Sequence, residues 1–262
     1  MNLASQIASF KERGFPADQA ESLALMSAAT GVLFQDFPES FLLFGGSSLV
    51  FFHQSARHSG DIDLLSRTEE PPTQNAIRES LERGLTATAE ALKLAPLQFE
   101  PIGKRGREVK LWTRSHSGQR LFSVDFTRFG SVLKSEVVEH NVAIGDKEFV
   151  KVQSASRDLL FLQKAECFLL RKFVKTRDSY DIHLLKSKGA ALDENLKNHL
   201  SDTLSNYEVE TEGIVKRIEW VDQKHCGSEL QPLLPPAVFE ELAKDGFECL
   251  RAALYELYAD WL

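Results

Sequence analysis

The sequence of 262 residues contains few cysteines and no long apolar run. Its three cysteines, Cys167, Cys226 and Cys249, are far apart and form no CxxC motif, which supports neither a disulfide framework nor a zinc site. The longest apolar stretch, near residues 41–52, is interrupted by a Gly-Gly-Ser-Ser sequence, so no membrane-spanning segment is predicted. The N-terminus lacks the apolar core of a secretory signal, and we expect a cytoplasmic protein.

Positive charge is also in deficit. The 31 Lys and Arg residues stand against 38 Asp and Glu residues, which gives a formal net charge of −7. A net acidic chain does not coat itself with nucleic acid, but one local basic site is still compatible with this charge. Two basic clusters, in residues 104–114 and 171–177, are candidates for guiding an RNA backbone, or they are solvated loops.

The pattern of apolar residues predicts an α+β protein with an α/β N-terminal half. Helices are expected in residues 1–40 and 74–93, and from residue 154 onward the pattern is helical almost to the end. The helical segments expected there are 156–174, 177–187, 192–205, 211–224 and 236–260. Short strands are expected at residues 41–44, 62–65, 97–100, 108–113, 120–126 and 137–144. We therefore expect an α/β domain over residues 1–150 and a helical domain over residues 151–262.

A glycine pair follows the first expected strand. Gly45 and Gly46 allow the backbone to approach a ligand closely, and Ser47 and Ser48 follow at the expected start of a short helix. Backbone N–H groups and a serine hydroxyl in this position suit an anion such as a triphosphate. The alternative for this element is a simple tight turn.

Two acids come next, separated by one apolar residue. In a strand, Asp61 and Asp63 project from one face while Ile62 enters the core. Adjacent carboxylates repel each other, and a bound Mg²⁺ relieves this repulsion. The alternative is a solvated pair at the end of a strand.

A third acid, Asp125, stands in the apolar run Phe122–Phe126. Burying an unpaired charge is costly, so we expect Asp125 either to complete a two-metal site or to pair with an arginine such as Arg128. The histidines near these motifs, His53, His58 and His183, show no metal-ligand spacing.

These motifs resemble the signature of polymerase-β-type nucleotidyltransferases. More narrowly, Gly45–Ser48 followed by Arg57–Leu64 is similar to the abortive-infection nucleotidyltransferase toxins, the AbiEii/AbiGii-like group of type IV toxin–antitoxin systems. Two later elements continue the resemblance: Lys164 within a helix, and the Arg-Asp-x-x-Asp motif of Arg177–Asp181. Within that last motif, Ser179 occupies a position that is usually apolar in the family.

The resemblance implies a mixed sheet flanked by helices, a helical C-terminal domain, and Mg²⁺-dependent transfer of a nucleoside monophosphate from a nucleoside triphosphate to an acceptor hydroxyl. It implies that Asp61, Asp63 and Asp125 bind two Mg²⁺ ions (or Mn²⁺), and that Asp181 orients Lys164 or lies beside the nucleotide. The residues that it places around the nucleotide are Gly45, Gly46, Ser47, Ser48, Arg57, Ser59 and Lys164. It further implies an RNA acceptor, tRNA being one candidate, and a separately encoded antitoxin.

The residues of the late motifs also allow simpler interpretations. Lys164 lies on one helix face with Phe168 and Arg171, where a half-buried lysine extends its ammonium outward. Arg177 and Asp181 are four apart and could form a surface ion pair.

Two other functions fit parts of the pattern. A glycosyltransferase uses an Asp-x-Asp motif with Mn²⁺ and a nucleotide sugar, but the position of the Gly-Gly-Ser element argues against it. A non-catalytic scaffold that binds RNA or protein through the helical half is disfavoured by three acids in apolar frames, which are costly to hold together without a cation.

Overall fold

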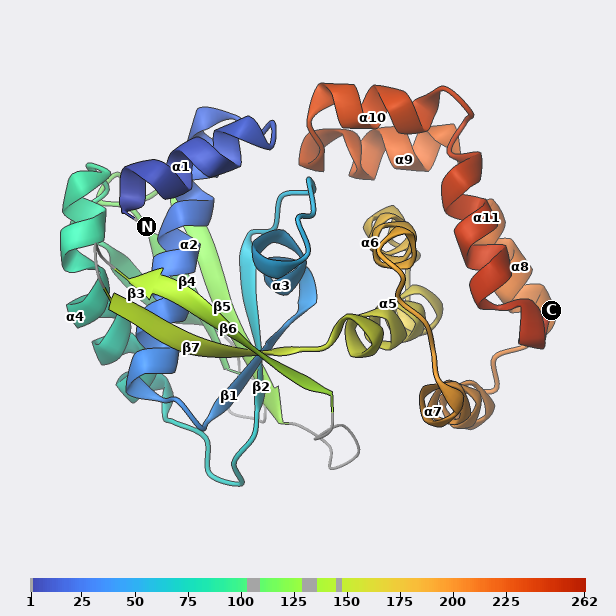
Figure 1. The fold of residues 1–262 in the computed structure, drawn as a ribbon, viewed down its shortest axis with the longest axis horizontal. Coiled ribbons are helices and arrows are strands. Elements are labelled where there is room, and N and C mark those ends of the chain that lie inside the picture. Colours follow the sequence, from blue (N-terminus) through green and yellow to red (C-terminus); the bar gives the residue numbers. More distant parts are fainter. Residues whose placement is uncertain (1, 103–108, 129–135, 145–147) are drawn as a thin grey trace. The chain divides into compact units, whose positions relative to one another are not determined.

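The computed structural model describes residues 2–102, 109–128, 136–144 and 148–262 (Figure 1). The basic residues 104–107 lie outside this part of the chain. The fold consists of two compact units, one made of Met1–Gln54 with His58–Ala155 and the other of Ser55–Arg57 with Ser156–Leu262. A three-residue segment near the middle of the N-terminal half therefore belongs to the C-terminal unit.

The first unit is built on a seven-stranded mixed sheet with the strand order β3-β4-β5-β2-β1-β7-β6. The strands are β1 (Phe41–Phe44), β2 (Asp61–Ser66), β3 (Gln98–Ile102), β4 (Val109–Arg114), β5 (Arg120–Arg128), β6 (Val137–Ile144) and β7 (Glu148–Ala155). Two pairs are parallel, β2 with β5 and β1 with β7, and the other four are antiparallel. This order places β2 and β5 side by side in the interior of the sheet.

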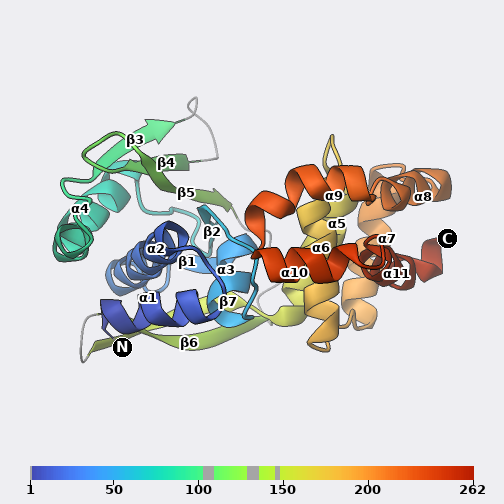
Figure 2. The same ribbon diagram turned by 90° about the horizontal axis from the view of Figure 1, so that it is seen from above.

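Four helices complete the first unit: α1 (Leu3–Glu12), α2 (Ala17–Asp36), α3 (Gly45–Phe52) and α4 (Gln74–Ala91). Helix α2 packs between α1 and α4 (Figure 2). Its buried residues form one hydrophobic core with the apolar side chains of the strands, such as Ile62 and Leu64 of β2 and Val124 of β5. This core covers one face of β2 and β5, so the alternate residues of both strands lie on the other face.

The second unit is helical in its described secondary structure. Its helices are α5 (Arg157–Leu170), α6 (Thr176–Ser187), α7 (Glu194–Asn206), α8 (Thr211–Glu219), α9 (Gln223–Glu229), α10 (Pro236–Ala243) and α11 (Glu248–Leu257), with short 3₁₀ turns at Gln231–Leu233 and Ala259–Trp261. Helix α6 packs against α5, α9 and α11. None of the helices in the part of the chain that the structure describes is long and apolar enough to span a membrane.

The expected fold class is confirmed, and most elements lie where the sequence predicts them. Strand β7 is an exception, because the polar residues of Glu148–Ala155 obscure its pattern and the helical pattern was expected from Ser154 onward. Val152, Ser154 and Ala155 are the buried residues of this strand.

Three helical segments also differ from the prediction. The segment expected over 156–174 ends at Leu170, where the guanidinium of Arg217 donates to the carbonyl oxygens of Phe168 (3.0 Å) and Arg171 (2.8 Å). The segment expected over 211–224 divides into α8 and α9, and the one expected over 236–260 divides into α10 and α11. The second division occurs where Gly246 and the buried Phe247 adopt positive φ values of 66° and 65°.

The crossing of α2 and α4 depends on a glycine. A Cβ atom on Gly84 would lie 2.5 Å from Cγ1 of Val32, which is closer than real contacts allow. We expect Gly84→Ala to lower the free energy of unfolding by about 1–3 kcal/mol, since the helices must separate. The matched change Gly213→Ala in α8, where the new Cβ meets no atom within 4 Å, should raise the free energy by about 0.5–1 kcal/mol. Urea unfolding of both variants measures the difference, and equal effects would contradict the packing argument.

Candidate functional site

Three carboxylates gather on the face of the sheet that the α2 core leaves uncovered. Asp61 and Asp63 alternate with the buried Ile62 on β2, and Asp63 is paired in register with Asp125 on the parallel strand β5. Asp61 is paired in the same way with Ser123. The predicted common face of Asp61 and Asp63, and the predicted neighbouring strand for Asp125, are both confirmed.

Cations and a hydroxyl counter these carboxylates. Lys110 Nζ lies 2.5 Å from Asp125 Oδ2, and Arg120 lies 3.5 Å from Asp61 Oδ1, which also accepts a hydrogen bond from the Ser123 hydroxyl. Among the described residues, the ion-pair partner of Asp125 is Lys110. The side chain of Arg128 lies outside the described residues, so its pairing with Asp125 stays a prediction.

Asp125 carries an unusual oxygen. Its Oδ1 is buried and forms no hydrogen bond, although the other oxygen is paired with Lys110. Burial raises the pKa of Asp125 above its usual range; the charge of Asp61 acts in the same direction, and Lys110 opposes both. A buried oxygen without a partner is costly, which indicates a site suited to a further cation or proton.

The donor set fits a hard divalent cation, because all three candidate ligands are carboxylates on adjacent strands. Across the described ranges, however, no three His, Cys, Asp or Glu side chains are arranged to hold a metal ion. Lys110 and Arg120 lie against two of the three carboxylates. The residues of the predicted metal site are together on one sheet face, and metal ligation by them is a prediction.

The glycine pair lies directly beside Asp63. Gly45 has a φ of 68°, and a Cβ atom on it would lie 2.7 Å from Cγ of Asp63, so only glycine fits. Helix α3 begins at Gly45 itself, two residues earlier than expected, and no side chain caps its N-terminus. The Ser47 hydroxyl donates to the carbonyl oxygen of Phe44 at 3.4 Å, whereas the hydroxyl of Ser48 is buried without a partner.

These features make the start of α3 a place for an anion. The first backbone N–H groups of a helix have no acceptor within the helix, and the helix dipole favours negative charge there. Ser59 is buried in the chain segment that leads from α3 to β2.

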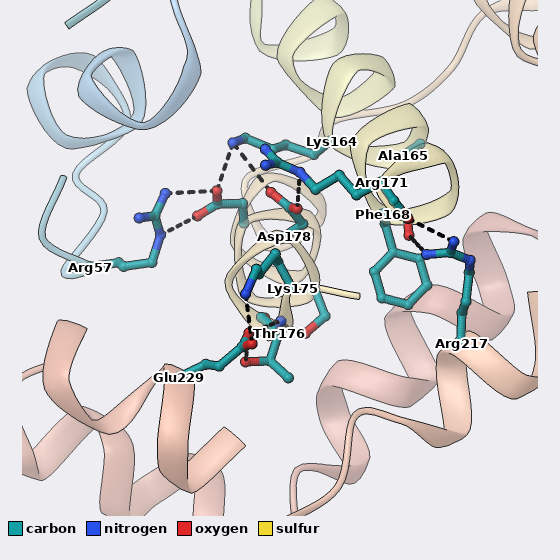
Figure 3. Close-up of polar contacts among 12 residues, drawn as sticks. Arg57, Lys164, Ala165, Phe168, Arg171, Lys175, Thr176, Asp178, Arg217 and Glu229 are labelled. Carbon is teal, nitrogen blue, oxygen red and sulfur yellow. Dashed lines mark hydrogen bonds and ion pairs between the residues drawn. The ribbon is translucent and has the colours of Figure 1, made fainter. Parts of the chain in front are cut away.

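The second unit contains a network of five charged residues, of which Arg57, Lys164, Asp178 and Asp181 are buried and Arg171 is partly exposed (Figure 3). Arg57 donates from Nε and Nη2 to the two oxygens of Asp181, at 2.9 Å each. Lys164 Nζ lies 3.0 Å from Asp181 and 3.7 Å from Asp178, and Arg171 Nε lies 3.0 Å from Asp178. Both aspartates are fully buried, and the Lys164 side chain is 6% exposed.

The pKa shifts of Arg57, Lys164 and Asp181 favour the ionised forms of these three groups. Burial alone would raise the pKa of Asp181, but the adjacent Arg57 and Lys164 outweigh burial and hold it below the usual range. Burial alone would lower the pKa of Lys164 and of Arg57, but the neighbouring aspartates, Asp181 foremost, raise both. Each charge is therefore stabilised by the others.

This network corrects the simpler interpretations of the late motifs. Lys164 is buried and paired, so it does not extend its ammonium outward. Asp181 pairs with Arg57 and Lys164 and is not part of a surface pair with Arg177. Ser179 is also buried, and its hydroxyl donates to the carbonyl oxygen of Thr176 at 2.6 Å, which satisfies a polar side chain at the family's apolar position.

Sequence reasoning missed Asp178 and the link from Arg57 to Asp181. Asp178 was visible as the first acid of the Arg-Asp-x-x-Asp motif, but its spacing from Lys164 gave no indication of contact. Arg57 and Asp181 are separated by 124 positions, and no local pattern connects them.

Solved structures share this fold. A candidate nucleotidyltransferase from H. pylori matches with a TM-score of 0.54 and 14% identity, covering 94% of this chain and 98% of that one. JHP933 from Helicobacter pylori matches with a TM-score of 0.52 and 13% identity, covering 90% of this chain and 91% of that one. The nucleotidyltransferase toxin MenT4 from Mycobacterium tuberculosis matches with a TM-score of 0.52 and 16% identity, covering 98% of this chain and 94% of that one. No curated protein sequence matches significantly. The chain therefore shares its fold with these three proteins.

The sequence itself identifies the family. The sequence model of the nucleotidyl transferase AbiEii toxins of type IV toxin–antitoxin systems matches residues 30–253. The chain belongs to this family, which confirms the resemblance found in its motifs.

The buried network makes stability depend on Asp181. We expect Asp181→Asn to lower the free energy of unfolding by about 3–5 kcal/mol near neutral pH, because Arg57 and Lys164 keep their buried charges without the counter-charge. Since the folded pKa of Asp181 is depressed, its contribution is complete above the unfolded pKa of about 3.9 and is lost as pH falls through the folded value. The variant should therefore show a weaker loss of stability in acid than the wild type.

Urea unfolding between about pH 7 and pH 3 measures both effects. Asp202→Asn, at an exposed position of α7, is the control. If the two variants unfold alike at neutral pH, the network does not stabilise the unit.

Proposed function

We propose that the protein is a Mg²⁺-dependent nucleotidyltransferase that acts as the toxin of its system. An acceptor hydroxyl oxygen attacks the α-phosphorus of a nucleoside triphosphate, the bond from that phosphorus to the bridging oxygen breaks, and pyrophosphate leaves. The acceptor is RNA, with tRNA as the first candidate. The observation that carries this proposal is the register of Asp63 with Asp125 beside Gly45, which supports a carboxylate site next to a phosphate site.

The three carboxylates would hold the metal. Asp61, Asp63 and Asp125 offer only hard oxygen donors, and Mg²⁺ bound to them would supply charge that the triphosphate and the attacking oxygen need. The Oδ1 atom of Asp125, which has no hydrogen-bond partner, either completes the ligand set or accepts the proton of the attacking hydroxyl.

The phosphates would bind at the start of α3. The N–H groups of Gly45 and Gly46 and the hydroxyls of Ser47 and Ser48 are donors for the β- and γ-phosphates. In this proposal Ser59 is a buried residue of the segment between α3 and β2 and lies two positions before Asp61.

The resemblance also assigns Lys164 and Asp181 to the site. Asp181 fixes the position of the buried Lys164 ammonium at 3.0 Å, so contact of Lys164 with the triphosphate would require the ammonium to leave this pair. Arg57 acts through its two hydrogen bonds to Asp181 and is a positioning residue, since its guanidinium is buried and bound to that carboxylate.

The family also implies a separately encoded antitoxin as partner. Family membership argues against a glycosyltransferase. The nucleotidyltransferase and the non-catalytic scaffold remain, and an assay for nucleotide incorporation separates them, because the scaffold predicts no turnover.

Asp61→Ala should lower the incorporation of labelled nucleotide by more than about 100-fold. Mutating a residue that only hydrogen-bonds to a metal ligand already lowers metal affinity or activity by about 10–100-fold, and Asp61 is proposed as a direct ligand. The assay uses Mg²⁺, total RNA and each labelled nucleoside triphosphate in turn. Asp202→Ala, at an exposed position on α7, should retain full activity. Equal labelling by Asp61→Ala and wild type would refute the assignment of the site, and a wild type without any labelling would favour the scaffold.

Gly45 tests the phosphate site separately. Gly45→Ala adds a Cβ that overlaps Asp63 at a positive φ, so we expect at least a tenfold loss of kcat/KM for the nucleotide. Gly60→Ala is the control, because its new Cβ meets only His58, at 4.0 Å. A Gly45→Ala protein as active as Gly60→Ala would contradict the close approach of Gly45 to the carboxylate site.

A further inference from the structure

The face of the sheet that carries Asp61 and Asp125 continues onto β4. Strand residues alternate between faces, so Lys110 and Trp112 share one face of β4 while Leu111 is buried in the core. The register shifts between Thr113 and Arg114, and the contact of Arg114 with the Trp112 ring places it beside this face. Lys110 is paired in register with Asp125 and lies against its carboxylate, which places this face of β4 on the carboxylate side.

Trp112 lies in the same row of the sheet as Asp61. Trp112 is paired with Ser123 on β5, and Ser123 is paired with Asp61 on β2. Neighbouring strands are about 4.8 Å apart, so the Trp112 and Asp61 backbones are separated by about 10 Å across the sheet. A chain lying along this row reaches the carboxylates within a few residues or nucleotides.

Two guanidinium groups lie against the ring of Trp112. Arg120 is 4.5 Å from the ring centroid and Arg114 is 5.2 Å from it. Arg114 belongs to the basic cluster of residues 104–114 that the sequence indicates, whereas the contact of Arg120 with Trp112 joins two strands and has no local signal. We call Trp112, Arg114 and Arg120 the tryptophan platform.

The arginines of the platform are held by exposed carboxylates. Arg114 pairs with Glu100, which is 50% exposed, and Arg120 pairs with Asp61 at the long distance of 3.5 Å. Ion pairs in water are weak, so either arginine can exchange its carboxylate for a phosphate. The indole N–H of Trp112 is buried and has no hydrogen-bond partner among the described residues.

We propose that the tryptophan platform binds the unpaired end of the RNA acceptor and directs its terminal hydroxyl toward Asp61 and Asp125. This inference rests on the proposed function and specifies that the RNA acceptor binds by an unpaired end. Proteins bind single-stranded RNA by combining aromatic rings, which contact bases, with arginines that contact bases or phosphates.

Binding is tested without catalysis, on the full-length chain. The probe is a fluorescein-labelled single-stranded RNA of about twelve nucleotides, titrated in EDTA without nucleotide and followed by anisotropy. Trp112→Ala and Arg114→Gln should each raise Kd about tenfold, and Trp112→Phe should lose less because it keeps a ring. Arg114→Gln should also reduce the dependence of Kd on salt.

The matched control is Arg78→Gln, which removes an arginine of α4 that pairs with Glu82. It should bind the probe as wild type does. Circular dichroism and thermal melting establish that Trp112→Ala is folded, and Arg114→Gln tests the platform without altering an aromatic residue. Unchanged Kd values for both Arg114→Gln and Trp112→Phe would overturn the proposal, as would equal binding of a fully paired RNA duplex.

Turnover gives a second readout. In the platform variants, KM for RNA should rise while KM for the nucleoside triphosphate stays unchanged. Failure of the proposed function is distinguishable: if the wild type binds the probe through the platform but labels a protein and no RNA, the RNA-acceptor assignment fails. If the wild type does not bind the probe yet labels RNA, the platform fails and the activity stands.

Discussion

Repulsion between like charges is the constraint on which the first unit depends. The parallel register of β2 and β5 places Asp63 opposite Asp125, with Asp61 two residues away on the same face. Neighbouring carboxylates are compatible with a stable sheet only when positive charge or hydrogen bonds are close by. Lys110, Arg120 and the Ser123 hydroxyl supply them. The same residues thereby define where a substrate with phosphate groups and its metal would enter.

The second unit meets a similar constraint by burial. Three cations, Arg57, Lys164 and Arg171, pair with two fully buried aspartates, Asp178 and Asp181. A buried network of this kind gains little net stability, because desolvation offsets most of the attraction. The first unit thus holds its carboxylates on a partly exposed surface, whereas the second holds its two aspartates in the interior.

Local patterns in the sequence predicted the strands β1, β2 and β5, the shared face of Asp61 and Asp63, and the glycine at the start of α3. They did not predict β7, because polar residues obscure the alternation of buried and exposed positions along that strand. They also failed to predict three contacts set by the tertiary fold: Lys110 with Asp125, Arg57 with Asp181, and Trp112 with Arg120. In each case the partners are distant in sequence, and only the register of strands or the packing of helices brings them together.

The segment Ser55–Arg57 has a consequence for how such a protein can be recombined. The chain leaves the first unit after Gln54, contributes Arg57 to the charge network of the second, and returns at His58 before continuing to β2. The helical unit is therefore not a module with a single junction at residue 155. A chimera that exchanges it at that junction alone would place a foreign Asp181 equivalent opposite a resident Arg57. Compatible exchange requires the three-residue segment and the helices to be inherited together, which ties the evolution of the two units to each other.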